Sequence, residues 1–188
     1  MELRVILNPI SEPGPAKRLL SNLFYGCGYN FYRFENELLA DDLLIRGKLS
    51  QLVRDCRAHL SSLEMAFLRD HRARTGGDYA FLSPAALTMA QALLSAQRHL
   101  QAMEAAIRSA TLPESRHFQR HHRERHGTLE ELVMLDGEVV LALVTLRDAV
   151  AKLDSGAAAA ARMDELLRAS DFRALWGRRE ALLAGGLA

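Results

Sequence analysis

Ionisable residues set into a helical apolar seam are the first candidates for chemistry in this chain. Positions between residues 31 and 66 follow one alternation of four and three residues, which keeps them on one side of a helix. They are Phe31, Glu35, Leu38, Asp42, Ile45, Leu49, Leu52, Cys56, His59, Leu63 and Ala66. Burying a carboxylate without a partner costs free energy, so Glu35 and Asp42 are candidate functional residues.

A second seam of the same kind places one further acid, Asp136, among apolar residues. Its members are Leu129, Leu132, Asp136, Val139, Leu143, Leu146, Val150 and Leu153. If the two seams pack together, their carboxylates could converge with His59 or Glu104 and hold a metal. The di-iron pattern needs two Glu-x-x-His pairs, however, and the chain offers the one that ends at His117. We therefore expect the seam acids to bond arginine, lysine or backbone donors.

His59 is the histidine on the first seam. It could bind haem or a metal ion, because imidazole is a common metal ligand. A lone histidine on an apolar face is more often a core residue that bonds a nearby group, and this is our expectation.

A basic, histidine-rich segment at residues 116–126 is the densest cluster of ionisable groups. It holds four histidines and four arginines: Arg116, His117, Arg120, His121, His122, Arg123, Arg125 and His126. Histidines one helical turn apart can share a metal, but the arginines would repel a cation. Arginines favour phosphate, an RNA backbone or an acidic protein surface. A solvated polar helix is the remaining interpretation.

An aromatic cluster at residues 24–34 is the second candidate binding surface. It contains Phe24, Tyr25, Tyr29, Phe31, Tyr32, Arg33 and Phe34. Tyrosine combined with arginine is typical of interface hot spots. Packing at the end of a bundle is the alternative, and we select Tyr25, Tyr29, Tyr32 and Arg33 as candidate partner-binding residues.

The bulk composition limits the class of protein. The 188 residues carry a net charge of +1, which argues against a general polyanion binder. Cys27 and Cys56 lie far apart and form no CxxC pair, so neither a zinc ribbon nor a disulfide framework is expected. The first residues are too few and too acidic for a signal peptide, and no apolar run is long enough for a membrane span. We expect a cytoplasmic protein that does not associate with membranes.

Cap and break signals predict the helices that would position these groups. Residues 1–15 form an extended arm, and helices follow at 16–25 and from Asn30 to about residue 72. Ser83 and Pro84 open a helix that stops before Pro113. A polar connecting helix spans residues 113–127, where Gly127 breaks it. The capping box at residues 128–131 opens a helix to about residue 153, and helices at 157–169 and 170–183 complete the chain.

These elements predict one all-α domain over residues 1–188. The expected fold is an elongated antiparallel bundle with a four-helix-type core and extra short helices. We expect a non-enzymatic interaction or accessory protein that binds another protein and needs no cofactor. Its candidate contacts are Tyr25, Tyr29, Tyr32, Arg33, Arg116, Arg120, Arg123 and Arg125.

Two other functions stay open from the sequence. One is a metal- or cofactor-binding bundle, with oxidoreductase activity as an option, that would use Glu35, Asp42, His59, Glu104 and Asp136. The weaker one is a nucleic-acid accessory protein acting through residues 116–126. The sequence leaves the oligomeric state open, homo-oligomers included.

Overall fold

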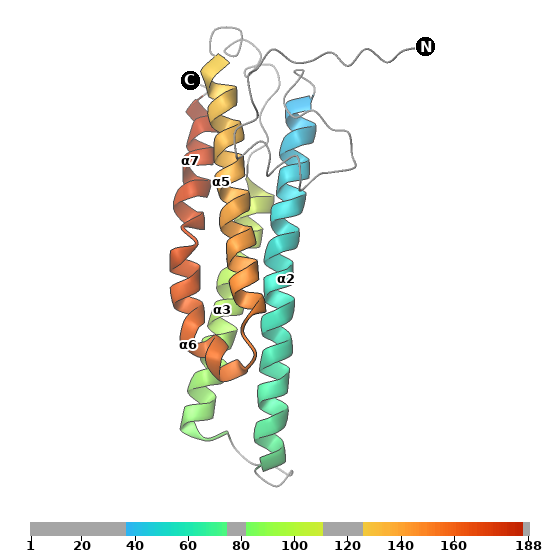
Figure 1. The fold of residues 1–188 in the computed structure, drawn as a ribbon, viewed down its shortest axis with the longest axis vertical. Coiled ribbons are helices and arrows are strands. Elements are labelled where there is room, and N and C mark those ends of the chain that lie inside the picture. The colour runs from blue at the N-terminus through green and yellow to red at the C-terminus, as the bar shows by residue number, and fades with distance from the viewer. Residues whose placement is uncertain (1–36, 75–81, 111–125, 186–188) are drawn as a thin grey trace, which may run out of the picture.

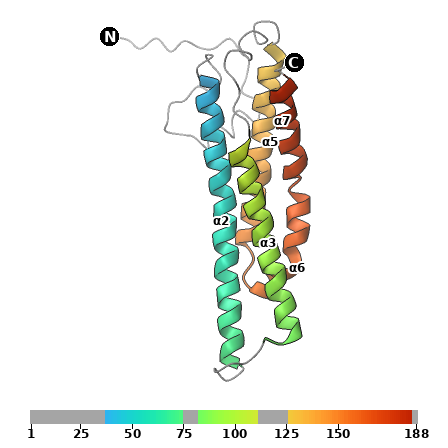
Figure 2. The ribbon, with the colours of Figure 1, turned by 180° about the vertical axis from the view of Figure 1, so that it is seen from behind.

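The protein is an elongated bundle of antiparallel helices, as the sequence predicts. A computed structural model describes residues 37–74, 82–110 and 126–185. Its helices are α2 (Glu37–Arg74), α3 (Pro84–Ser109), α5 (His126–Ala151), α6 (Gly156–Ala169) and α7 (Phe172–Gly185), and no strand occurs in these ranges. The helices lie along the long axis of the molecule, and α6 and α7 follow each other to fill the fourth position (Figure 1). Seen from behind, α2 lies beside α3, and α6 and α7 lie on the far side of α3 from α2 (Figure 2).

Serine caps open two of the helices. The hydroxyl of Ser83 accepts a hydrogen bond from the Ala86 amide at 3.2 Å, and Pro84 takes the first helical position. The Ser155 hydroxyl accepts from the Ala158 amide at 3.3 Å and starts α6. These local signals explain why the starts of α3 and α6 can be read from the sequence.

The observed start of α5 differs from the predicted break at Gly127. The helix begins at His126 and runs through Gly127, which the sequence analysis took as a break. The predicted cap at Thr128 therefore lies inside the first turn. A single glycine costs a helix only about 1 kcal/mol, and the buried seam that follows outweighs this cost.

The long helix α2 passes Gly47 without interruption. A Cβ built at Gly47 would meet nothing within 4 Å, so this glycine is not required by a close contact. At about 1.5 Å per residue, the 38 residues of α2 reach about 57 Å. The length is accommodated by the elongated shape of the bundle.

Both predicted seams form the core. The second seam is buried from Leu132 to Leu153, and the first from Asp42 to Leu63 apart from the half-buried His59. The prediction that the first seam extends to Ala66 is wrong, because Ala66 is exposed. A strict seven-residue repeat drifts by about 20° per heptad on a straight helix. The buried stripe therefore shifts to Leu60 and the half-buried Phe67.

The break between α6 and α7 is local and sharp. The amide of Ser170 donates to the Leu166 carbonyl at 3.0 Å and closes α6. Asp171 then takes a φ of 50°, a left-handed conformation that aspartate tolerates better than most residues. The chain resumes a helix at Phe172, so α7 can lean toward α5 while α6 stays on α3.

No helix in the described ranges combines the length and the apolar character that a membrane crossing needs.

Candidate functional site

Two aspartates of the predicted seams meet in the core through an arginine of α7. The guanidinium of Arg179 donates from Nε to Oδ1 of Asp136 on α5 and from Nη2 to Oδ1 of Asp42 on α2, the latter at 2.6 Å. All three side chains are almost fully buried. Asp42 and Asp136 therefore have the cationic partner that the sequence analysis expects for a buried acid.

A second arginine extends this network to α3. Nε of Arg46 lies 2.7 Å from Oδ2 of Asp42, one helical turn away on α2. Nη1 of Arg46 donates to the carbonyl oxygen of Ala110, the cap residue of α3. The network of Asp42, Arg46, Asp136 and Arg179 thus joins all four positions of the bundle. We call the end of the bundle that holds it the network end.

The charges of the network balance. Two aspartates face two arginines in a region shielded from water, where attraction between opposite charges is strong. Burial by itself lowers the pKa of Arg179, but the adjacent carboxylates of Asp136 and then Asp42 raise that pKa above its ordinary value. The arginine stays charged, and neither carboxylate is left to face the core alone.

Trp176 covers one side of the central arginine. The guanidinium carbon of Arg179 lies 5.0 Å from the centre of the indole ring, within the range of a cation–π contact. Phe172 stacks on Trp176 with ring centres 5.8 Å apart. Nη1 of Arg179 has no hydrogen-bond partner in the described part of the chain.

The structure does not gather the predicted metal ligands. Asp42 and Asp136 are drawn together by Arg179, which occupies the space between their carboxylates with a positive charge. Within residues 37–74, 82–110 and 126–185, no three histidine, cysteine, aspartate or glutamate side chains are placed to share a metal ion. Glu35 lies outside the described residues.

Glu104 belongs to a separate ion-pair group nearer the surface. Its Oε2 lies 3.1 Å from Nη1 of Arg57 on α2, and its Oε1 lies 2.9 Å from Nη2 of Arg108 one turn along α3. The contact with Arg57 ties α3 to α2. Both oxygens of Glu104 are engaged by arginines, as expected for a buried glutamate.

His59 bonds a backbone group, in agreement with the expectation for a core histidine. Its Nε2 lies 2.9 Å from the carbonyl oxygen of Leu153, where α5 has just ended. Since a carbonyl can only accept, Nε2 carries the proton and donates it. The imidazole therefore holds the turn between α5 and α6 against α2.

Cys56 is a free, buried thiol. Burial, assisted by the negative charge of Asp55, raises the pKa of Cys56 to about 11. A thiol that stays protonated at neutral pH is a poor nucleophile. Cys56 is a core residue, and Cys27 lies outside the described residues.

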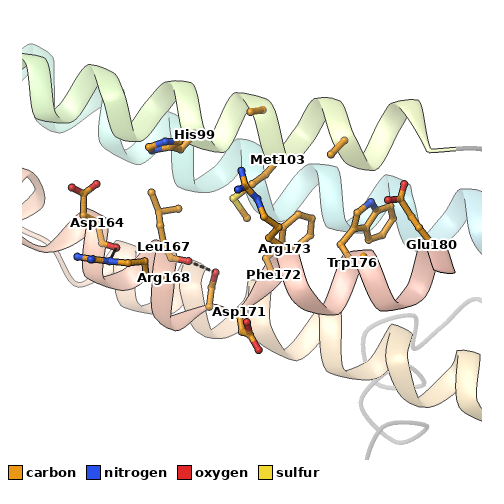
Figure 3. A pocket seen from close by; sticks show the side chains of 14 residues that line it. His99, Met103, Asp164, Leu167, Arg168, Asp171, Phe172, Arg173, Trp176 and Glu180 are labelled. Atoms are coloured by element: carbon orange, nitrogen blue, oxygen red, sulfur yellow. Dashed lines mark hydrogen bonds between the residues drawn. The ribbon is translucent and has the colours of Figure 1, made fainter. Parts of the chain in front are cut away.

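A groove runs beside the network, between α3 and the α6–α7 pair. α3 packs closely on α6 but makes little contact with α7, because α7 packs on α5. The resulting groove has a volume of about 740 Å³. Figure 3 shows its lining, with His99 and Met103 on α3 facing Leu167, Phe172, Arg173 and Trp176 across the gap.

The predicted partner-binding residues lie outside the described residues. Four of them precede α2 in the sequence, namely Tyr25, Tyr29, Tyr32 and Arg33, and the other four, Arg116, Arg120, Arg123 and Arg125, come between α3 and α5. The groove is lined by other residues.

Arg179 is the functional-site candidate that the sequence analysis missed. A signal for it exists, because Phe172, Trp176, Arg179 and Leu183 follow the same alternation of four and three residues as the two seams. All four are buried in α7. An arginine on the buried face of the last helix indicates that an acid on another helix must face it.

The fold and this site define the chain as an all-α antiparallel bundle with a buried aspartate–arginine network at one end. Comparison of the chain with protein-family models, curated proteins and solved structures gives no match.

Proposed function

We propose that this chain is a non-enzymatic interaction or accessory protein that binds another protein through segments joined to the network end. The observation that supports this proposal is where the described helices begin and end. α2 and α5 both begin at the network end, and α3 runs toward it (Figure 1). The bond from Arg46 to the Ala110 carbonyl ties the end of α3 to the first turns of α2.

The two candidate binding segments are covalently attached at these points. The aromatic cluster at 24–34 leads into α2, and the basic segment at 116–126 connects α3 to α5. A rigid end reduces the entropy that a binding surface built on it must lose when a partner docks. The buried ion pairs hold α2, α3, α5 and α7 together at this end, so both segments are attached to helices that are joined to one another.

The chemistry of the two segments favours a protein with an acidic surface as partner. Arginines form bidentate bonds with carboxylates, and tyrosines contribute apolar area together with a hydroxyl. The net charge of +1 gives no general attraction for nucleic acid. The ion pairs of Asp42, Glu104 and Asp136 favour a structural role for these acids over a metal-binding one.

The experiment compares arginine variants against one identified partner. Proteins captured with the tagged chain are identified, and one is purified for calorimetric titration. Changing Arg116, Arg120, Arg123 and Arg125 together to glutamine should weaken binding, with the largest effect at low salt. Changing Tyr25, Tyr29 and Tyr32 to serine should weaken it at all salt concentrations.

The control removes the same charge from elsewhere on the bundle. Arg54, Arg69, Arg98 and Arg162 are exposed and lie on described helices, and their joint change to glutamine should leave affinity unchanged. Equal weakening by both quadruple variants would show a net-charge effect and contradict the proposal. Steeply salt-dependent binding to an RNA oligonucleotide, lost in the first variant alone, would favour the nucleic-acid function instead.

A further inference from the structure

The groove between α3 and α7 has the size of a small-molecule site. Its volume of about 740 Å³ lies within the usual range for ligand pockets, roughly 300–1,000 Å³. The groove exists because α7 leans on α5 after the left-handed turn at Asp171. It is therefore a consequence of how the backbone is arranged.

The floor of the groove is apolar. Met103 and Leu167 are half-buried, and Phe172 and Trp176 are almost fully buried. Methionine is flexible and polarisable, so it adapts to ligands of different shape. This floor suits the hydrocarbon part of a ligand.

Arg173 is the cationic group at the centre of the groove. Arg173 extends from α7 toward Met103, and His99 projects from the α3 side one turn before Met103 (Figure 3). Arg173 is exposed and has no hydrogen bond or ion pair to another described residue. An unpaired guanidinium above an apolar floor favours an anionic head group on an apolar body.

The acidic groups of the groove limit the charge of that head group. Asp164 and Glu180 lie toward opposite ends of the groove, and the side chain of Asp171 is turned away from α3 (Figure 3). Arg168 bends back to its own helix, where Nε donates to the Asp164 carbonyl at 3.1 Å. Two flanking carboxylates would repel a doubly charged phosphate more than a single carboxylate.

Trp176 adds a donor to this environment. The indole Nε1 is buried and has no acceptor in the part of the chain that the structure describes. Buried donors of this kind are normally paired. A ligand that brings oxygen acceptors to this wall of the groove could satisfy the donor, whereas a pure hydrocarbon could not.

We propose that the groove binds a small amphipathic carboxylate, with its hydrocarbon part on Met103 and Leu167 and its carboxylate on Arg173. His99 faces the same space from α3. This site is separate from the segments at 24–34 and 116–126, so it does not depend on the proposed protein partner.

The test uses decanoate, decanol and decylammonium, which share one hydrocarbon chain and differ in the head group. Trp176 is the single tryptophan of the protein and lines the groove, so its fluorescence reports occupancy. Calorimetry on the full chain gives affinity and stoichiometry independently. We expect one decanoate per chain, bound about tenfold or more tightly than decanol, and no saturable binding of decylammonium.

Three variants locate the site. Arg173→Gln should weaken decanoate about tenfold and leave decanol unchanged. Ala102→Phe, at an exposed position in the lining, should block both ligands. Arg178→Gln is the matched control, because Arg178 sits on the same helix and lies 3.6 Å from Glu138 of α5, outside the groove. Circular dichroism checks that each variant is folded.

Several results would overturn the proposal. Equal affinity for the three head groups would make the groove a nonspecific apolar surface. If Arg173→Gln and Arg178→Gln weakened decanoate binding equally, Arg173 would not be the contact of the carboxylate. The absence of saturable decanoate binding up to about 1 mM would mean that the groove does not serve as a site for this class of ligand.

Discussion

At the scale of single residues, Arg179 is the arginine that bonds both buried aspartates of the network. Replacing Arg179 by methionine keeps an unbranched side chain but removes the guanidinium. Asp136 and Oδ1 of Asp42 then lose their bonds to Arg179. Removing one member of a buried ion pair typically costs about 3–5 kcal/mol. We expect Arg179→Met to lower the free energy of unfolding by this amount in urea denaturation.

Two further variants separate the charge effect from packing. Arg178→Met changes the exposed neighbour and should cost less than about 1 kcal/mol. The double variant Arg179→Met with Asp136→Leu leaves Asp42 paired with Arg46 and should recover most of the loss. If the double variant is as unstable as Arg179→Met, the guanidinium contributes through packing and the charge argument is wrong.

The buried thiol of Cys56 gives a prediction about alkaline pH. Its pKa is raised to about 11 in the folded protein, so the folded state holds the proton where the unfolded state has released it. Stability is unaffected below about pH 9 and should fall between about pH 9 and 11, by up to about 1.4 kcal/mol per pH unit. Urea denaturation across this range measures the effect.

The comparison with Cys56→Ala in a Cys27→Ser background isolates this thiol. The alanine variant should lack the additional alkaline loss, although it is less stable at pH 7 because a side chain has been shortened in the core. A thiol reagent should react with Cys56 at pH 8 only after unfolding. Rapid reaction in the native protein would contradict the assignment of Cys56 as an inert core residue.

At the scale of helices, replacing Gly156 and Gly47 by alanine should have opposite effects on stability. A Cβ at Gly156 would lie 2.8 Å from the Cβ of Phe67, so α6 and α2 would have to move apart. We expect Gly156→Ala to cost about 1–3 kcal/mol, the usual range for overpacking. Gly47→Ala meets nothing and should stabilise the long helix α2 by about 0.5–1 kcal/mol.

Thermal unfolding of both alanine variants checks this pair. The melting temperature should fall for the first variant and rise for the second. If Gly156→Ala were neutral, the close approach of α6 to α2 would not be a constraint on the fold.

At the scale of the whole molecule, stability depends on the shared core of the helices. Leu52 on α2 and Leu143 on α5 are each 1% exposed and come from the two predicted seams. Replacing either with alanine should cost about 2–5 kcal/mol through lost burial and a new cavity. Chemical denaturation measures the cost, and a value below about 1 kcal/mol would show that the seams are not the core.

The path of the chain was largely predictable because helices respond to local signals. The helix start at Ser83–Pro84 and the two seams depend on residues close in sequence, and the structure confirms both. Asp42 and Asp136 were identified as buried acids for the same reason. The cap at Ser155 is equally local, but the sequence analysis did not name it. The boundary at His126 and the exposure of Ala66 were missed, because neighbouring helices and cumulative helix drift decide them.

The sequence by itself determined an all-α bundle, the burial of its seams and the need for partners at its acids. Only the tertiary structure decided that Arg179, far along the chain, is the partner of both aspartates. It also decided that α3 and α7 separate into a groove beside Trp176. The physical reason is that helix formation and burial follow a local period, whereas ion pairs and grooves depend on which helices become neighbours and on how each one leans.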